Sequence, residues 1–503
     1  MPTPSTNATL GLWAGRSTFF WSAAAATIGL GNLWHFPWLA SQFGGGYFVL
    51  MYLFFLLVVT LPLVLAESAL GRHSRHNMSL AMGTEAKARR LSPRWRWVGR
   101  ISVLSGFLVL SITLVIGSIC LAYVFYGALG RFAGATPASM TGLLGQLVEN
   151  PHEYRGFMAW HLFFIALVGV VAIRQVSVER AFRLVVPVVL ILLMLLVGWS
   201  QWRGLAGGSL EAVVGFRWQD VGFRSVWFAL SHAFYTLGIG LGVWAVLGAL
   251  MAPGAPLKRS VFAVALLDTV VGVMAGVVIY AIAQSMVDAG DARGFGLVFI
   301  ALPVGLGGLE YHQLLSTAVF AVILLVAWTS ALVLVEAVVA WLREWLVSPR
   351  PASVLLVLVF AWLLGLITLF SFNIWSDVQF AGLTPFRWIE WITSGLLIPF
   401  VAAALAIFLG WLVPVGYLTE LLGAPREWLA RLWHFALRYL LPLVVVAVGL
   451  SYSVASLHPL CESADLIWCA QSPHDVTSGS ENGAGDSGAS DQRSRGPGRA
   501  ADF

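Results

Sequence analysis

The chain has 503 residues, of which 59% are hydrophobic and only 11% are charged, and its formal net charge is +5. This composition excludes a water-soluble globular domain of this length and is typical of a polytopic membrane protein. The small positive charge is attributed to basic loops, so we expect a lipid bilayer as partner and no nucleic acid. The first residues lack the pattern of a cleavable signal peptide, and the first apolar segment is expected to stay in the membrane.

Residues 17–39 form the first apolar segment, which is about long enough to cross a bilayer. The sequence Gly29-Leu30-Gly31-Asn32 lies in its centre and is typical of a helix that unwinds. Irregular backbone at membrane depth is tolerated only where it is buried in protein or lines a cavity, because unpaired N–H and C=O groups are costly in hydrocarbon. The interruption therefore predicts an ion or small-solute site.

Further apolar segments predict an all-α polytopic membrane protein with eleven transmembrane helices. The expected spans are 17–39, 46–71, 98–130, 157–174, 178–200, 223–251, 259–287, 312–346, 352–372, 386–413 and 430–455. The longest of these spans are expected to tilt or to continue beyond the bilayer.

Lysine and arginine gather in four of the segments that connect these spans. They are Arg72, Arg75, Lys87, Arg89, Arg90, Arg94, Arg96 and Arg100, then Arg174, Arg180 and Arg183, then Lys258 and Arg259, and last Arg343 and Arg350. All four segments lie on one side of the predicted bundle, which the positive-inside rule makes cytoplasmic. The N-terminus is then expected in the cytoplasm and the C-terminus outside.

The span at 223–251 repeats the interruption of the first span, with Gly238, Gly240 and Gly242 in its centre. Two interrupted helices in corresponding halves predict a secondary transporter built as a 5+5 inverted repeat. The alternative is that these glycines allow close packing of continuous helices. The expected units are a cytoplasmic segment 1–16, repeats 17–200 and 201–413, a last-span region 414–455 and an extracytoplasmic tail 456–503.

An unwound segment frees carbonyl oxygens to bind a hard cation, and the exposed N-terminus of a half-helix favours an anion. Thr27, Asn32 and Thr236 lie near the two interruptions and offer side-chain oxygens without formal charge. Together they predict a site that can hold Na⁺ with a substrate carboxylate beside it.

Several blocks in a fixed order resemble the neurotransmitter:sodium symporters over about residues 13–455. They are Gly29-Leu-Gly-Asn-Leu-Trp-His-Phe-Pro37, Gly44-Gly-Gly46, Pro62, Glu67-Ser-Ala-Leu-Gly-Arg72, the glycines of the sixth span, Gly296-Leu-Val-Phe-Ile-Ala-Leu-Pro303, Thr329-Ser-Ala331 with Glu336, and Leu437-Arg-Tyr-Leu-Leu-Pro442. The resemblance implies the LeuT fold and Na⁺-coupled import of an amino acid or related small zwitterion by alternating access. The absence of long terminal domains suits a bacterial-type member in the inner cell membrane.

The resemblance also implies two sodium sites. The first would use Thr27, Asn32, Thr236 and Asp268, and the second the backbone oxygens of Ala25, Ile28 and Val326 with the hydroxyls of Thr329 and Ser330. Two structural alternatives remain open: the Thr–Ser pair could bond back to its own helix, and Asp268 could be a buried hydrogen-bond anchor. Glu67 is implied to tie an unwound segment rather than to bind cargo.

The same resemblance implies a substrate pocket at the centre of the bundle. Its lining would be Ala26, Leu30, Gly31, Val109, Thr113, Tyr235, Thr236, Gly238, Leu241, Ser330 and Leu334. Gly29 stands where amine-carrying members place an aspartate, which favours an amino acid. Thr113 stands where the family usually has tyrosine and Gly238 where many members have serine, so we expect a roomier pocket and a bulkier substrate.

The gates implied by the resemblance depart from the family pattern. At the outer gate His35 and Glu390 replace an arginine and its acid; this pair could be pH-sensitive, or His35 could be a neutral vestibule residue. At the inner gate Trp13 and Glu344 match the pattern, but Leu10 replaces the usual arginine. We therefore expect an inner gate that lacks a charge partner.

Chloride dependence is expected to be absent. Tyr52 matches a chloride ligand of animal members, but His232 replaces a glutamine and Gly272 a serine, and Asp268 could supply the negative charge.

The chain contains three cysteines. Cys120 is expected to be a small apolar packing residue. Cys461 and Cys469 follow the last span, where a disulfide and two free thiols both stay open. Residues 471–503 are predicted to be disordered because they hold few apolar groups.

A channel, an enzyme and a solute sensor are the other functions open to such a chain. A channel needs a continuous pore, and an enzyme needs a nucleophile–base pair or a metal cluster that these scattered histidines do not form, so no enzyme is expected. A transport-inactive solute sensor of the same fold is the alternative, since only a flux measurement separates it from a transporter. A monomer or weak dimer is expected.

Overall fold

The computed structural model describes residues 10–204, 206–288, 294–416 and 427–463. Within these ranges the chain is helical, and the β contacts are two isolated bridges, Gly45 with Phe216 and Phe380 with Leu383. The expectations for the far N-terminus, for a Cys461–Cys469 disulfide and for a disordered tail concern residues or side chains outside the described part of the chain.

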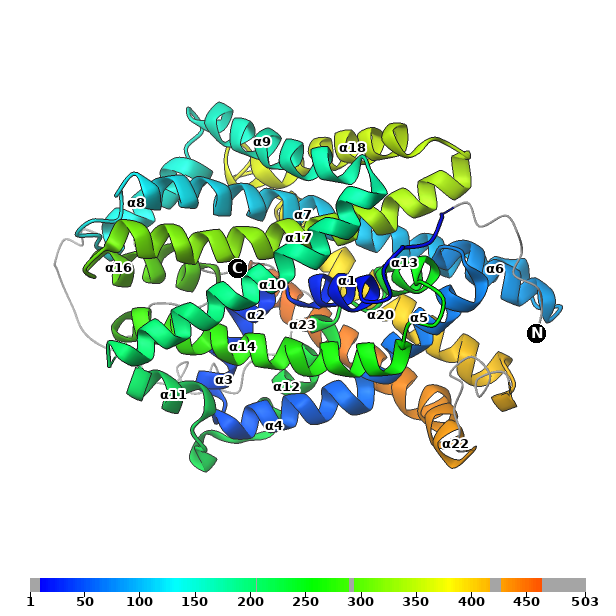
Figure 1. The fold of residues 1–503 in the computed structure, drawn as a ribbon. Helices are drawn as coiled ribbons and strands as arrows, with labels where there is room; N and C mark the ends of the chain where they lie inside the picture. The colour runs from blue at the N-terminus through cyan, green and yellow to red at the C-terminus, as the bar shows by residue number, and fades with distance from the viewer. Residues whose placement is uncertain (1–9, 205, 289–293, 417–426, 464–503) are drawn as a thin grey trace, which may run out of the picture.

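The helices of the first half lie side by side with those of the second half in one bundle (Figure 1). The first half holds α1 (Thr18–Thr27), α2 (Leu30–Leu33), α3 (His35–Gln42), α4 (Gly46–Phe55), α5 (Leu61–Ser74), α6 (Met78–Ala88), α7 (Arg96–Ala128), α8 (Pro137–Val148), α9 (Tyr154–Ala172), α10 (Gln175–Trp202) and α11 (Ala206–Val214). The second half holds α12 (Phe223–Thr236), α13 (Val243–Leu250), α14 (Leu257–Asp288), α15 (Gly294–Gly296), α16 (Leu302–Gly307), α17 (His312–Leu346), α18 (Arg350–Phe372), α19 (Pro385–Glu390), α20 (Ile398–Ile407), α22 (Glu427–Phe435) and α23 (Leu441–Ser463). Short π-helical segments join several neighbours, namely η1 (Leu56–Thr60), η4 (Leu297–Ala301), η5 (Trp391–Leu397), η6 (Phe408–Leu412) and η7 (Ala436–Leu440), and two 3₁₀ turns are η2 (Pro93–Trp95) and η3 (Trp218–Asp220).

Among the described residues, nine helices are long and apolar enough to cross a membrane. They are Gly46–Ser74, Pro93–Ala128, Tyr154–Ala172, Gln175–Trp202, Leu257–Ala283, His312–Leu346, Arg350–Phe372, Pro385–Leu412 and Ala430–Leu457. Each coincides with an expected span, while the two interrupted segments are absent from this set because neither forms one continuous helix. The all-α polytopic class is thus confirmed, and the total of eleven spans stays a prediction.

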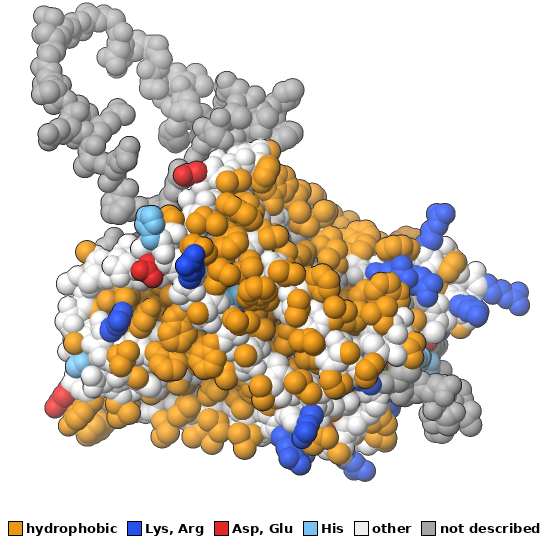
Figure 2. Space-filling model, turned by 90° about the horizontal axis from the view of Figure 1, so that it is seen from above, with side chains coloured by type: hydrophobic (Ala, Val, Ile, Leu, Met, Phe, Trp, Pro, Cys, Tyr) orange, Lys and Arg blue, Asp and Glu red, His pale blue; other side chains and the backbone are white. Residues whose placement is uncertain are grey.

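The molecular surface agrees with a bilayer environment. Figure 2 shows a face covered largely by hydrophobic side chains, with several lysine and arginine side chains gathered at one end. Exposed large apolar groups occur on many helices, for example Val170 at 74% exposed, Leu184 at 66% and Leu443 at 73%. Water would disfavour so much apolar surface, whereas lipid chains accommodate it.

Both predicted interruptions are present. The first helix ends at Thr27, Ile28 leaves helical geometry with ψ at 88°, and Gly29 is extended before the short helix α2 begins. The second interruption separates α12 from α13, and Gly238, Gly240 and Gly242 have φ values of 64°, 80° and 72°. Only glycine adopts such left-handed backbone without a steric cost, so the glycine pattern itself creates the break.

Glu67 holds the second break in place, as the resemblance implied. Its side chain is fully buried, and its two carboxylate oxygens accept hydrogen bonds from the backbone N–H groups of Gly240 at 3.4 Å and Ala245 at 3.3 Å. These donors lie where α12 has ended and α13 begins, so their N–H groups lack helical partners. The structural role of Glu67 is confirmed.

The centre of the bundle is formed by α7 and α17, which pack against each other more extensively than any other pair of described elements (Figure 1). The helix α1 packs on α14, α10 and α17, and α13 packs on α5 and α17. The two breaks therefore face the same central helices, which brings segments about two hundred residues apart to one site.

Candidate functional site

A cavity of about 270 Å³ lies between the two breaks and the central helices. It is lined by Ala26, Thr27, Gly29, Leu30, Gly31, Asn32, His35, Val109, Thr113, His232, Tyr235, Thr236, Leu237, Gly238, Leu241, Val243, Ser330, Val333 and Leu334. Every residue of the expected substrate pocket is in this lining. The fold therefore gathers those residues around one space, although their role in binding stays a prediction.

The carboxylate of Asp268 is the centre of a buried polar cluster at this cavity. One oxygen, Oδ1, accepts a hydrogen bond from Asn32 Nδ2 at 2.9 Å, and the other, Oδ2, accepts from Tyr52 Oη at 2.6 Å and Thr236 Oγ1 at 3.2 Å. Asp268 is fully buried, and among the described residues no basic side chain forms an ion pair with it. A buried carboxylate without a cationic partner is costly, so the cluster suits a bound cation.

The other residues of the first expected sodium site lie beside Asp268. Asn32 and Thr236 contact it directly, while Thr27 lines the same cavity and donates its hydroxyl to the carbonyl of Ala24 at 3.3 Å. The amide oxygen of Asn32 also accepts the backbone N–H of Gly29 at 3.2 Å, across the first break. The expected site would draw its oxygen ligands from α1, α2, α12 and α14, and oxygen atoms are the ligands that hard cations prefer.

The second expected sodium site joins α17 to the first break. The hydroxyl of Ser330 donates to the carbonyl oxygen of Ile28 at 3.3 Å, so these two expected ligands lie together. The hydroxyl of Thr329 instead donates to Leu325 at 3.0 Å and Val326 at 3.1 Å, which is the bonding to its own helix that formed the alternative interpretation. Ala25, the remaining expected ligand, is buried in α1 one turn before Ile28.

The expected outer-gate pair is not formed in this structure. One oxygen of Glu390 accepts from Arg387 at 3.2 Å and the other from Tyr452 Oη at 3.0 Å. His35 instead packs edge-on against His232, with ring centroids 5.2 Å apart, and both rings line the cavity. The reason is local, because Arg387 lies three residues before Glu390 on the same helical stretch and neutralises it there.

His232, which stands at a position of a chloride ligand in animal members, is also a wall of the cavity. Its Nε2 atom is buried and has no hydrogen-bond partner among the described residues, and its ring packs between Phe36 and Tyr52 with centroids at 5.7 and 5.4 Å. A buried nitrogen without a partner at the edge of a cavity is available to a bound solute. The presence of a histidine on a predicted cavity helix was the sequence signal for it.

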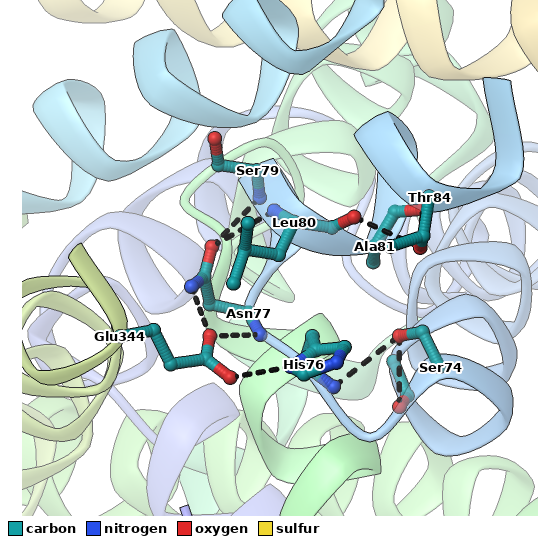
Figure 3. A network of polar contacts seen from close by, with 9 residues as sticks. Ser74, His76, Asn77, Ser79, Leu80, Ala81, Thr84 and Glu344 are labelled. Carbon is teal, nitrogen blue, oxygen red and sulfur yellow. Dashed lines mark hydrogen bonds and ion pairs between the residues drawn. The ribbon is translucent and has the colours of Figure 1, made fainter. Parts of the chain in front are cut away.

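The inner end of the site has a partner that sequence reasoning did not anticipate (Figure 3). Glu344 Oε1 contacts His76 Nδ1 at 2.6 Å, and Glu344 Oε2 accepts hydrogen bonds from the backbone N–H of Asn77 at 2.9 Å and from its side-chain amide. Leu10 is buried, and the backbone N–H of Trp13 donates to Leu250 at 2.9 Å. The carboxylate that was expected to lack a charge partner is therefore held by the segment between α5 and α6.

The electrostatics of this contact follow from its geometry. The hydrogen bond with Glu344 raises the pKa of His76 above its ordinary value; partial burial opposes this rise, and the negative charge of Glu344 adds to it. Protonated His76 and ionised Glu344 then form an ion pair at the edge of the bundle. The 268 positions between the two residues explain why no local pattern revealed it.

A bundle of long apolar helices around a cavity between two broken helices defines a secondary transporter. A model of the Sodium:neurotransmitter symporter family matches residues 11–134 and 153–464, and the chain belongs to this family. The sodium-dependent transporter YhdH of Bacillus subtilis is 29% identical over 449 residues, which cover 87% of this chain and 97% of that protein. A sodium-dependent transporter of Haemophilus influenzae is 24% identical over 455 residues, with 87% and 97% covered.

The comparison with solved structures agrees with the family. The crystal structure of MhsT in complex with L-phenylalanine superposes with a TM-score of 0.77 at 26% identity, covering 88% of this chain and 99% of that chain. The expected LeuT fold of a bacterial-type member is thus confirmed, and the chain is a multi-pass membrane protein. The boundaries of the two inverted repeats stay predictions.

Proposed function

We propose that this protein is a Na⁺-coupled symporter that imports an amino acid by alternating access, with substrate and two sodium ions bound at the cavity between the breaks. The observation that carries the proposal is the buried Asp268 carboxylate beside the cavity, which neutral donors surround and with which no basic side chain of the described residues forms an ion pair. One sodium ion beside Asp268, Asn32 and Thr236 would neutralise that charge. Its occupancy would couple to the substrate because the same cavity holds both.

The second sodium ion would bind between the first break and α17. The contact of Ser330 Oγ with the carbonyl of Ile28 supports this position, since a cation there would replace one hydrogen bond by two oxygen–metal contacts. Thr329 would turn its hydroxyl from Val326 toward the ion. Such an ion would tie the first broken helix to the central helix and so respond to their relative movement.

The chemistry of the cavity wall favours a zwitterion with a bulky apolar side chain. The lining contains no aspartate or glutamate, so an amine without its own acid group has no counter-ion there. Val109, Leu241, Val333 and Leu334 supply an apolar wall. MhsT was solved with L-phenylalanine, and we infer a large apolar amino acid here as well.

Thr113 is the residue that we expect to set the size of the substrate. Its hydroxyl donates to the carbonyl of Val109 at 2.8 Å, within its own helix, so it leaves the centre of the cavity open. Tyr235, on the other side, donates its hydroxyl to Ser394 at 2.7 Å and presents its ring to the cavity.

Transport is proposed to be independent of chloride. The hydroxyl of Tyr52 is directed to Asp268, whose fixed negative charge can serve in place of an anion. The position of Gly272 supports the same proposal, because a Cβ there would lie only 2.7 Å from the ring of Phe36.

Orientation in the membrane is proposed from the arginine-rich connections. The connection from α5 to α7 carries Arg75, Lys87, Arg89, Arg90 and Arg94, and Arg343 and Arg350 flank the connection between α17 and α18; both connections are placed in the cytoplasm. The N-terminus would then be cytoplasmic, and import would run toward the side of Glu344 and His76.

The first experiment measures the thermal stability of the purified protein in Na⁺ or K⁺ with a panel of amino acids, amines and osmolytes. A solute that binds the folded state raises the melting temperature by mass action. We expect large apolar amino acids to stabilise in Na⁺ and not in K⁺. If no solute does so, the assigned ion sites are wrong.

Flux in liposomes then separates the transporter from the solute sensor. The compound that stabilises in Na⁺ should accumulate only under an inward Na⁺ gradient. Stabilisation by Na⁺ and substrate without accumulation would contradict symport and favour the sensor.

A further inference from the structure

A second hollow lies outside the transport site, on the surface between α7, α17 and α18. It has a volume of about 330 Å³ and lies at the start of α7, the end of α17 and the start of α18. Its walls are Arg100, Val103, Leu104, Phe107, Val338, Trp341, Leu342, Trp345, Leu346, Leu356, Val357 and Phe360. We call this hollow the α7–α17–α18 groove.

The walls of the groove are apolar and open to the surroundings of the bundle. Trp345 is 59% exposed, Phe360 54% and Leu104 47%, and the rings of Trp341 and Trp345 stack with centroids 4.9 Å apart. The three helices are membrane-spanning candidates, so the groove opens toward lipid rather than toward water. Its shape and chemistry suit a hydrocarbon chain.

Arg100 is the single charged residue among those that line the groove. Its guanidinium lies 4.5 Å from the ring centroid of Trp97. This cation–π contact does not neutralise the positive charge of Arg100. In the described part of the chain no acidic side chain pairs with Arg100. The groove therefore combines an apolar surface with one positive charge that no described acidic side chain neutralises.

The acidic groups on the neighbouring helix are already engaged. Glu336 is bonded to Arg350 from the start of α18, including a contact of 3.1 Å, and Glu344 is bonded to His76 and Asn77 from the segment between α5 and α6. Among the described residues these two carboxylates therefore do not offset Arg100, which suits an anion from the surroundings. An anion with hydrocarbon chains matches both parts of the groove.

We propose that the α7–α17–α18 groove binds one anionic glycerophospholipid, with its phosphate at Arg100 and an acyl chain along Leu104, Phe107 and Phe360. The groove lies at the arginine-rich end of the bundle, which is the end assigned to the cytoplasmic leaflet, and that leaflet carries negative charge. Trp97 lies at the start of α7 and Trp345 near the end of α17, and such ends of membrane-spanning helices are where aromatic rings are enriched. This site is independent of the sodium and substrate sites.

The test counts bound lipid on the full-length protein in detergent by native mass spectrometry. Dioleoyl phosphatidylglycerol and dioleoyl phosphatidylcholine share their acyl chains, and glycerol 3-phosphate is the headgroup without chains. We expect phosphatidylglycerol to bind more tightly than phosphatidylcholine and glycerol 3-phosphate not to bind. Comparable binding of glycerol 3-phosphate would overturn the proposal in favour of a soluble phosphate site.

Variants assign the binding to the groove. Arg100→Gln should weaken phosphatidylglycerol binding about fivefold, the effect of one basic side chain near an anionic headgroup, and Arg100→Lys should keep most of it. The matched control Arg94→Gln removes an exposed arginine in η2 that does not line the groove, and should leave binding unchanged. Equal losses in Arg94→Gln and Arg100→Gln would show a non-specific lipid shell and refute the site.

A second variant does not depend on the charge. Leu104→Phe adds volume inside the groove and should weaken the binding of both lipids, since the acyl chain is displaced in each case. Unchanged binding in Leu104→Phe would refute the acyl-chain position even if Arg100→Gln failed to fold.

Discussion

The charge of Asp268 gives the most informative perturbation. Asp268→Asn keeps the shape of the side chain and removes its negative charge. The carboxylate accepts three side-chain hydrogen bonds, from Asn32, Tyr52 and Thr236, and all three donors are neutral. Tyr52 and Thr236 carry hydroxyls that can also accept, so the amide of the variant keeps its hydrogen-bond partners.

The stability difference between Asp268→Asn and the wild type depends on the cost of burying the charge and on the stabilisation by bound Na⁺. The first favours the variant in K⁺, and the second favours the wild type in Na⁺. Without Na⁺ the wild type bears a fully buried carboxylate with which no described basic side chain forms an ion pair, so Asp268→Asn should be at least as stable as the wild type in K⁺. With Na⁺ at about a hundred times its dissociation constant, the wild type gains about 2.7 kcal/mol, and the variant should lose that increment. The order of stability should therefore reverse when Na⁺ replaces K⁺.

The assay is the melting temperature of both proteins in detergent, in matched NaCl and KCl, at several salt concentrations. The control is Glu67→Gln, because Glu67 accepts hydrogen bonds from the backbone of the second break. This substitution should lower the melting temperature by the same amount in both salts. An Asp268→Asn protein that keeps the full Na⁺-dependent rise would refute the sodium site. A variant much less stable than the wild type in K⁺ would show that Asp268 is a structural anchor instead.

Four further results are expected. Gly240→Ala should lower the free energy of unfolding by about 2–3 kcal/mol, since left-handed backbone costs about 1–2 kcal/mol and the new Cβ would lie 2.9 Å from the Ile398 carbonyl oxygen. The control Gly238→Ala should cost less, because its new Cβ would meet only the side chain of Leu241 at 3.4 Å. Equal losses of stability for the two variants in urea or thermal unfolding would contradict this reasoning. The pKa of His76 is raised, so its ion pair with Glu344 should stabilise the protein fully below about pH 6.5, and this stabilisation should be lost as the pH rises through the raised pKa. The melting temperature of the wild type should therefore fall between pH 6 and 9, and His76→Gln should lose this pH dependence. Thr113→Tyr should fill the cavity and impair uptake of the native substrate in proteoliposomes, while unchanged uptake would refute the roomier pocket. Replacing external chloride by gluconate should leave uptake intact, and a loss of uptake would restore a chloride site beside Tyr52.

Local properties of the chain were sufficient to predict the membrane helices and their two interruptions. Hydropathy is a sum over neighbouring residues, so the nine continuous spans could be located without knowing how they pack. Left-handed backbone at Gly238, Gly240 and Gly242 depends on the absent side chains of those residues themselves. The family pattern around Gly29 and Asn32 then predicted which residues gather at the central cavity.

Partners between distant segments could not be predicted in the same way. Tyr52 meets Asp268 across 216 positions and His76 meets Glu344 across 268, while Glu390 bonds Arg387 and Tyr452 rather than His35. A hydrogen bond needs its two atoms within about 3 Å, and the rotation and tilt of each packed helix decide which side-chain atoms come within that distance. Which oxygen is satisfied by which donor therefore follows from the packing of the helices and not from their sequence.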